Sequence, residues 1–173
     1  MKLRLAGILS ESIVDGPGVR FVVFAQGCLH HCPGCHNKAT WDTKGGEVAT
    51  VKEILKKIKR RVKYIRGITL SGGEPFLQAE EMAQLAYAAR KLGLDIITYT
   101  GYVYEELLQI DLPGSKDLLG ATDMLIEGPF ILAKKDISLQ YRGSSNQRII
   151  DLSKNKEQRQ ACNISYMTML YSS

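Results

Sequence analysis

The sequence of 173 residues contains no long apolar segment, since its longest apolar stretches have only the length of a strand. A membrane-spanning helix needs about 20 consecutive apolar residues. A secretory signal needs an apolar stretch followed by a small-residue cleavage site, and the N-terminus, Met-Lys-Leu-Arg-Leu, leads into neither. We therefore expect no signal peptide, no membrane partner and a cytoplasmic location, where thiols stay reduced.

The chain also has few prolines, no internal repeat and no stretch typical of a linker. It contains five prolines, and 45% of its residues are hydrophobic, which is typical of a globular protein with a sizeable core. We predict a single domain over residues 1–173. Residues 152–173 are polar with a short apolar end and no clear period, and they are predicted to form a flexible C-terminal tail.

A strong excess of one charge is absent as well. Lys plus Arg is 23 and Asp plus Glu is 18, which gives a net charge of +5. A helix predicted over residues 50–66 has one basic face, made of Lys52, Lys56, Lys57, Lys59, Arg60, Arg61 and Lys63. A nucleic-acid-binding surface usually has aromatic residues among its basic ones, and this face has almost none. We expect this face to be a solvated outer surface and predict no nucleic-acid partner.

Cysteine is scarce, and three of the four cysteines lie within eight positions. Pro33 and Gly34 predict a turn that lets the sulfurs of Cys28, Cys32 and Cys35 point into one pocket. This spacing favours a 4Fe-4S cluster with three thiolate ligands. One of its four irons would then lack a protein ligand and could bind a small molecule.

Two other interpretations of these cysteines stay open. The first is a zinc site whose fourth ligand is His30, His31, His36 or Cys162. Structural zinc sites more often take their ligands as two separated pairs, and no second CxxC or HxxxH pair is present. The second is a disulfide, which would leave one of the three cysteines unpaired. Outside a zinc site, Cys162 is interpreted as a spare thiol.

Strands and helices are predicted to alternate along the chain. Apolar runs predict strands, and apolar residues at helical spacing predict helices. The predicted strands are 3–9, 19–25, 68–70, 94–98, 124–126 and 148–150. Three helices are predicted: the first begins at Thr50 and ends before Gly67, the second covers 79–92, and the third is short and ends at Leu108. This order predicts an α/β fold with a mainly parallel sheet. A full eight-stranded barrel typically takes about 250 residues, so we expect an open, partial (β/α) barrel.

Two segments should meet at one rim of this sheet. The cysteine loop follows the strand 19–25, which has the continuous apolar pattern of a buried parallel strand, and Ser71–Pro75 follows the strand 68–70. Gly72 and Gly73 let the backbone approach a ligand closely, and the Glu74 carboxylate suits a positively charged amino group. Gly-Gly-Glu-Pro by itself is equally compatible with a plain turn before a helix.

Together, these motifs resemble those of a known family. Asp15–Arg20, Cys28–Asn37 and Ser71–Pro75 are similar to motifs of the radical S-adenosylmethionine superfamily, and within it of the activating enzymes of glycyl-radical proteins. The chain resembles more narrowly the subgroup that acts on anaerobic ribonucleoside-triphosphate reductase, and the stretches that carry this resemblance are Thr40–Trp41, Tyr99–Tyr102, Glu127–Phe130 and Tyr141–Asp151.

This resemblance implies a fold, two cofactors and a reaction. The fold would be the partial barrel of the superfamily, with a 4Fe-4S cluster on Cys28, Cys32 and Cys35. S-adenosylmethionine would bind the open iron and be cleaved reductively to a 5′-deoxyadenosyl radical, with no catalytic side chain beyond the ligands of the two cofactors. The residues implied in cofactor binding are Gly34, Cys35, His36, Gly72, Gly73, Glu74 and Thr100.

The resemblance also implies protein partners. The radical would remove hydrogen from a glycine in a loop of the large reductase subunit, and a donor such as flavodoxin would supply the electron. We expect Tyr99–Tyr102 and Tyr141–Gln147 to contact the reductase. The alternative is that Arg142 and Arg148 only anchor a loop by hydrogen bonds.

The sequence differs from the family pattern at several positions. Gly34 precedes the third cysteine where the superfamily often has an aromatic residue, His36 follows it where the subgroup tends to have one, and Glu127 replaces an aspartate. Two other functions are kept as alternatives. The first is activation of pyruvate formate-lyase or another glycyl-radical enzyme, and the second is a non-catalytic zinc-binding or nucleic-acid-binding module.

Overall fold

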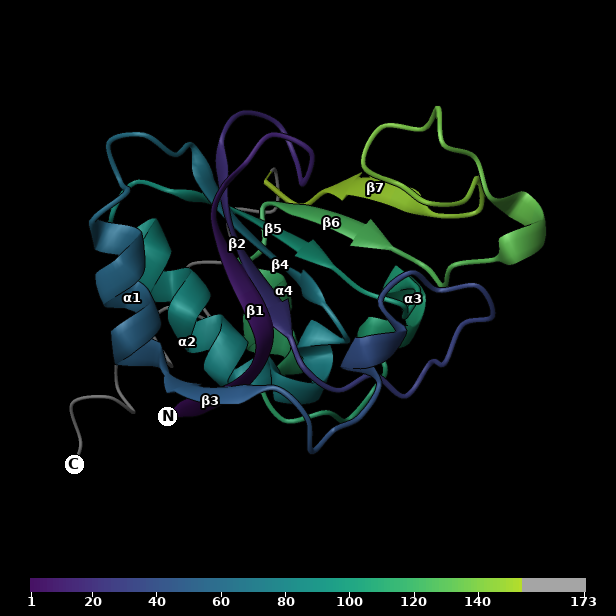
Figure 1. The fold of residues 1–173 in the computed structure, drawn as a ribbon, viewed down its shortest axis with the longest axis horizontal. Coiled ribbons are helices and arrows are strands. Elements are labelled where there is room, and N and C mark those ends of the chain that lie inside the picture. The colour runs from purple at the N-terminus through teal and green to yellow at the C-terminus, as the bar shows by residue number, and fades with distance from the viewer. Residues whose placement is uncertain (154–173) are drawn as a thin grey trace.

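The computed structural model describes residues 1–153, so Cys162 and the predicted tail beyond Ser153 lie outside the described residues. Within residues 1–153, seven strands form one open sheet in the order β3-β1-β2-β4-β5-β6-β7 (Figure 1). The strands are β1 (Lys2–Ser12), β2 (Arg20–Ala25), β3 (Glu47–Thr50), β4 (Gly67–Gly72), β5 (Asp95–Tyr99), β6 (Met124–Glu127) and β7 (Arg148–Asp151).

The four central strands, β2, β4, β5 and β6, pair in parallel. β1 and β3 at one edge and β7 at the other pair antiparallel. Helices connect β4 to β5 and β5 to β6, as parallel pairing requires, whereas β1–β2 and β6–β7 are joined by connections without an α-helix. The expected open α/β architecture is confirmed. The sheet of residues 1–153 is partly parallel, with three parallel pairs in its centre and three antiparallel pairs toward its edges, because the strands at the edges are joined without a helical crossover.

The helices are α1 (Val51–Lys59), α2 (Ala79–Arg90), α3 (Tyr104–Leu107) and α4 (Ser115–Ala121), and three short 3-10 turns are η1 (Lys38–Thr40), η2 (Pro75–Gln78) and η3 (Leu132–Lys134). α1, α2 and α4 lie on one side of the sheet (Figure 1). Alternate strand residues such as Phe21, Ile68 and Ile96 point to these helices and are fully buried with them in the core. No helix in residues 1–153 is long and apolar enough to cross a membrane.

The prediction that the first helix continues almost to Gly67 was wrong, because α1 ends at Lys59. Its predicted start is confirmed, since Thr50 and Glu53 form a reciprocal capping box. After Lys59 the chain has to reverse to enter β4. It does so through successive turns, in which the Arg61 amide donates to the Ile58 carbonyl and the Tyr64 amide to the Arg61 carbonyl.

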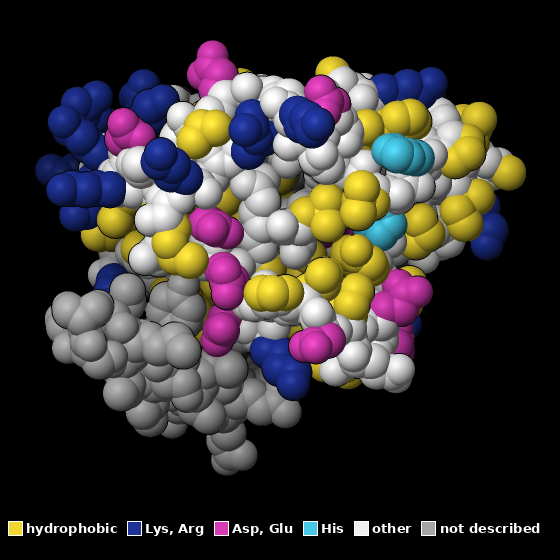
Figure 2. All heavy atoms as spheres, turned by 90° about the horizontal axis from the view of Figure 1, so that it is seen from below, with side chains coloured by type: hydrophobic (Ala, Val, Ile, Leu, Met, Phe, Trp, Pro, Cys, Tyr) yellow, Lys and Arg dark blue, Asp and Glu magenta, His cyan; other side chains and the backbone are white. Residues whose placement is uncertain are grey.

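The lysines and arginines of this segment are exposed, as expected for a solvated outer face. Figure 2 shows Lys and Arg side chains concentrated at one end of the face that it displays, while the histidines lie at the other end among hydrophobic side chains. β3 and α4 were not predicted. Each is short, at four and seven residues, and too brief to show a clear hydrophobic period.

The remaining strand residues face away from the helices. Phe24 of β2, Ser71 of β4 and Tyr99 of β5 line one pocket on this inner face. Arg20 occupies the opposite end of the same face and is fully buried. The loop between β1 and β2 lies against this end, because the Thr69 hydroxyl donates to the Asp15 carbonyl at 2.9 Å. The pocket therefore opens at the carboxyl ends of the parallel strands.

Candidate functional site at the carboxyl ends of the strands

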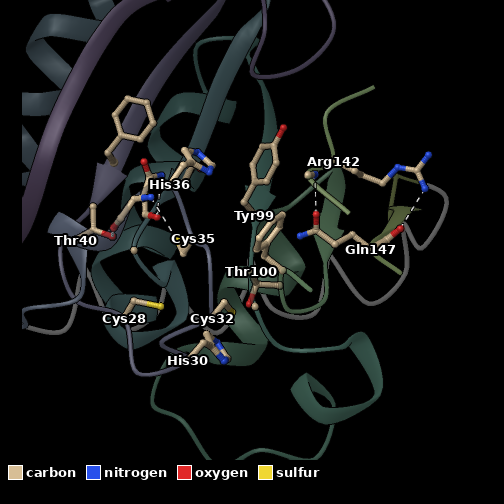
Figure 3. Close-up of a pocket in the computed structure, with 18 of the residues that line it drawn as sticks. Cys28, His30, Cys32, Cys35, His36, Thr40, Tyr99, Thr100, Arg142 and Gln147 are labelled. Carbon is tan, nitrogen blue, oxygen red and sulfur yellow. Dashed lines mark hydrogen bonds between the residues drawn. The ribbon is translucent and has the colours of Figure 1, made fainter. Parts of the chain in front are cut away.

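The cysteine loop leaves the end of β2 and borders a pocket of about 520 Å³. Cys28, Cys32 and Cys35 all line this pocket and are all partly buried. The predicted Pro33–Gly34 turn is confirmed, since the Cys35 amide donates to the Cys32 carbonyl at 3.0 Å and Gly34 has a φ of +77°. Figure 3 shows Cys28 and Cys35 on one side of the pocket, with Cys32 beside Thr100 in this view and Tyr99 farther along the same wall as Thr100.

Gln26 fixes the point where the loop leaves the strand. Its side-chain amide donates to the carbonyls of Ala39 and Asp42, at 3.0 and 2.7 Å. Two backbone hydrogen bonds support the same segment, from Gly27 to Thr40 and from Cys28 to Trp41. The sequence that follows the loop therefore folds back against its start.

The two glycines after β4 approach the start of the cysteine loop closely. A Cβ on Gly73 would lie 2.2 Å from the Gly27 carbonyl oxygen, and one on Gly72 would lie 2.7 Å from the Ala25 backbone. The Gly73 and Glu74 amides donate to the carbonyls of Ala25 and Gly27, at 2.8 and 2.7 Å. These positions thus require glycine for contact between two backbone segments, and both glycines also line the pocket.

Glu74, which the sequence predicted to contact a ligand through its carboxylate, is buried beside the pocket and does not line it. Its side chain is 1% exposed and is absent from the lining of the pocket. Its carboxylate accepts hydrogen bonds from the Phe76 amide, the Thr100 hydroxyl, the Gly101 amide and His30, at 2.8–3.0 Å. A carboxylate has about four acceptor positions, so all of them are used within the protein.

The other predicted cofactor-binding residues lie as follows. His36 and Thr100 line the pocket, and Thr100 is nearly fully buried. Gly34 lies outside the lining, where a Cβ would stand 2.8 Å from a methyl group of Leu132. Leu132 belongs to the long connection between β6 and β7, so this connection extends to the cysteine loop.

Sequence reasoning missed several residues of the pocket wall. Phe24, Leu139 and Val14 line it, and they come from a strand and from two loops far apart in the chain. The apolar pattern of residues 19–25 marked Phe24 as buried but not which face of the sheet it would occupy. Val14 and Leu139 have no signal in the local sequence.

Two of the three histidines proposed as zinc ligands, His30 and His31, contact other side chains of the protein. The His30 ring contacts Tyr102 edge-on, with 4.5 Å between ring centroids, and the His31 ring lies 4.8 Å from the centroid of Trp41. In the part of the chain that the structure describes, no group of three or more His, Cys, Asp or Glu side chains, the three pocket cysteines included, is already arranged to hold a metal ion, so this finding does not separate zinc from a cluster.

The donor set fits an iron–sulfur cluster. Thiolates are the ligands of such clusters, and three thiols face one pocket here. Burial raises the pKa of the Cys28 thiol, while hydrogen bonds from the backbone at His30 and His31 oppose this shift. Burial also raises the pKa of Tyr99, so its hydroxyl stays protonated in the opposite wall.

Comparison with known proteins separates the cluster from zinc. The sequence matches the family described as "4Fe-4S single cluster domain" over residues 14–150. It is 37% identical to the anaerobic ribonucleoside-triphosphate reductase-activating protein of Enterobacteria phage T4, over 79% of this chain and 86% of that protein. It is 35% identical to the pyruvate formate-lyase 1-activating enzyme of Escherichia coli strain K12, over 87% of this chain and 61% of that protein.

Among solved structures, QueE from Escherichia coli aligns with 58% of this chain and 53% of its own, at a TM-score of 0.48 and 21% identity. The sequence relatives are much closer and span most of both chains. Residues 14–150 hold all three cysteines of the pocket and the glycine segment beside them. The chain therefore belongs to the 4Fe-4S single cluster domain family and, within it, to the anaerobic ribonucleoside-triphosphate reductase-activating proteins.

Proposed function

We propose that this chain activates an anaerobic ribonucleoside-triphosphate reductase by generating a glycyl radical on it. When bound, a 4Fe-4S cluster and S-adenosylmethionine supply the chemistry: one electron breaks the bond from sulfur to the ribose 5′ carbon, giving methionine and a 5′-deoxyadenosyl radical that takes hydrogen from a glycine. One observation carries the proposal. Three cysteines face one pocket in a chain that is 37% identical to an activating protein of this kind.

In this proposal Cys28, Cys32 and Cys35 ligate the cluster. Each thiol has to lose its proton to bind iron, and iron binding offsets the burial that raises the pKa of Cys28. Residues 1–153 contain no fourth cysteine, so in this proposal they would supply three thiolates and one iron would stay open to the substrate.

S-adenosylmethionine would lie in the same pocket, beside Gly72, Gly73, Thr100 and the segment 34–36. The glycine backbone is the better acceptor for its amine, because protein donors already occupy every acceptor position of Glu74. His36 lines the pocket beside Cys35, and we propose that its ring contacts the adenosine part.

The reductase glycine would enter through the mouth of this pocket. Val14 lines the pocket and is 73% exposed, and Ile137, two residues before the lining residue Leu139, is 93% exposed. We propose that both contact the large reductase subunit, together with Tyr99–Tyr102 and Tyr141–Gln147. Replacement of Ile137 by Ser should then lower glycyl-radical yield without changing cleavage of S-adenosylmethionine in the absence of the reductase.

The two rim arginines have partners within the chain. Arg142 donates to the Gln147 carbonyl at 3.1 Å, and Arg148 pairs with Glu127 and Glu105. These contacts support their alternative role as anchors of the connection between β6 and β7.

The proposed setting is the cytoplasm, as one domain over residues 1–173, with an electron donor such as flavodoxin. In an assay of 5′-deoxyadenosine formation, reduced flavodoxin should be able to supply the electron in place of the chemical reductant dithionite. A chain that works with dithionite but never with reduced flavodoxin would use another donor.

The central test is anaerobic reconstitution of the wild-type chain and of single Cys→Ala variants. The wild type should bind about four irons and form 5′-deoxyadenosine, and the variants at Cys28, Cys32 and Cys35 should lose both properties. Cys162→Ala is the matched control and should keep both. Any one of the three pocket variants that formed 5′-deoxyadenosine at the normal rate would contradict the proposal.

Electron paramagnetic resonance then identifies the partner. A glycyl radical should appear after mixing with the large subunit of the anaerobic reductase. The 35% identity to a pyruvate formate-lyase activating enzyme makes that lyase the second candidate, although this chain covers only 61% of that relative. A radical on the lyase alone would favour the second candidate, and colourless protein with one zinc would favour a non-catalytic module.

A further inference from the structure

His30 lies between the first two cysteines, and its ring is enclosed by residues from another part of the chain. Its Nε2 lies 2.9 Å from Glu74 Oε2. Because a carboxylate only accepts hydrogen bonds, Nε2 is the donor. The ring also contacts Tyr102 edge-on and packs onto Gly101, where a Cβ would lie 2.4 Å from the ring atom Cδ2.

Glu74 connects this ring to the ends of two strands. One oxygen, Oε2, accepts from His30 and from the Gly101 amide, and the other, Oε1, accepts from the Thr100 hydroxyl and the Phe76 amide. Thr100 and Gly101 follow β5, and Glu74 itself follows β4. A single buried carboxylate thus joins the cysteine loop, the end of β4 and the end of β5.

We propose that His30 and Glu74 are positioning residues that hold the cysteine loop in place, so that Cys28 and Cys32 face the pocket. The inference rests on the proposed function, because the loop matters as the carrier of the cluster ligands. It gives Glu74 a role different from contact with the substrate. In this role the Glu74 carboxylate does not touch the cluster ligands Cys28 and Cys32, and it positions them through its hydrogen bond with His30, which lies between them in the sequence.

The neighbouring His31 provides a matched comparison. It lies in the same spacer between Cys28 and Cys32, but its ring contacts Trp41 instead of Glu74. Its φ is +47°, a conformation that asparagine tolerates well. His30→Asn and His31→Asn therefore make the same chemical change one position apart, and only the first breaks the link to Glu74.

Two measurements on these variants test the proposal. In the metal-free chain, His30→Asn should speed hydrogen–deuterium exchange over residues 28–36, whereas His31→Asn should leave it near the wild-type rate. In the reconstituted chain, His30→Asn should lose iron to a chelator about 10- to 100-fold faster, which is the usual effect of removing a group that orients metal ligands. It should also change the resonance spectrum of the reduced cluster with S-adenosylmethionine.

Rescue and coupling separate positioning from a general loss of structure. His30→Gln retains an amide donor that can reach Glu74 and should recover part of the iron retention. The double variant His30→Asn with Glu74→Gln should lose iron more slowly than the product of the two single effects, because both changes break the same link. Fully multiplicative effects would overturn the proposal, as would a His30→Asn variant that matches the wild type in exchange and iron loss.

The outcome for the proposed function can be read separately. If the wild type binds its cluster and cleaves S-adenosylmethionine while His30→Asn behaves identically, only the positioning role fails. If the wild type binds no cluster, the proposed function fails, and hydrogen exchange of the metal-free variants still decides whether His30 holds the loop.

Discussion

Replacement of Arg20 by Met should destabilise the fold while leaving the cluster site intact. Arg20 is fully buried at the start of β2. Its guanidinium donates to the Thr69 hydroxyl at 3.1 Å, to the Ile68 carbonyl at 2.6 Å, and to Asp95. These contacts join β2, β4 and β5 at the end of the sheet opposite the cysteine loop. Burial lowers the pKa of Arg20, and the Asp95 carboxylate opposes this shift only in part.

The size of the effect follows from what Met would leave behind. Removing one partner of a buried ion pair costs about 3–5 kcal/mol. The lower value applies here, because Asp95 is 33% exposed and keeps Arg66 at 3.0 Å. A loss of about 3 kcal/mol in the free energy of unfolding corresponds to a fall in Tm of roughly 6–12 °C for a chain of this size.

Urea and thermal unfolding of the metal-free chain, followed by circular dichroism, measure this loss. Arg66→Met is the control, because Arg66 pairs with the same carboxylate but is 60% exposed. It should cost about 1 kcal/mol or less. Iron content per folded chain should be unchanged in both variants. Equal losses for Arg20→Met and Arg66→Met would refute the reasoning that burial of the guanidinium determines its contribution.

Three other substitutions test separate contacts. Arg148→Met leaves the buried Glu127 carboxylate with the Tyr104 amide as its donor, so thermal unfolding should show a lower Tm than the wild type. Lower activation at an unchanged Tm would instead indicate a partner contact. Gly101→Ala should speed iron loss, since its methyl group would meet the His30 ring, whereas Gly7→Ala, with nothing within 4 Å, should not. Thr50→Ala removes the capping box and should lower unfolding free energy by about 1 kcal/mol without affecting iron content, which urea titration and iron analysis measure.

Much of the fold could be predicted because its signals are local. The capping box of α1 depends on Thr50 and Glu53, three positions apart, and the turn at Pro33–Gly34 depends on two adjacent residues. The continuous apolar pattern of residues 19–25 predicted a buried strand, and β2 has five of its six residues buried. The end of α1 was predicted wrongly because Val62 and Ile65 continue the helical spacing after the helix has stopped.

For the candidate site, the sequence predicted which segments of the chain meet but not all the contacts between them. The spacing of three cysteines and the glycine segment after a strand predicted which segments would meet at the rim. They did not predict that the Glu74 carboxylate would accept hydrogen bonds from within the protein, because its donors His30 and Gly101 lie 44 and 27 positions away in the chain. Nothing near Glu74 in the sequence distinguishes a carboxylate that contacts a ligand from one that supports a loop.

The sequence by itself determined the features that depend on neighbouring residues: the thiol spacing, the turn between the second and third cysteines, the start of α1 and the alternation of strands with helices. The tertiary structure decided which distant side chains share a partner. Parallel pairing sets Arg20 opposite Gly67, and Gly67 opposite Asp95, and the same register sets the ends of β4 and β5 side by side. The physical reason is that sheet register is a property of the assembled strands, so contacts that span it, such as Arg20 with Asp95 and His30 with Glu74, have no local pattern in the chain.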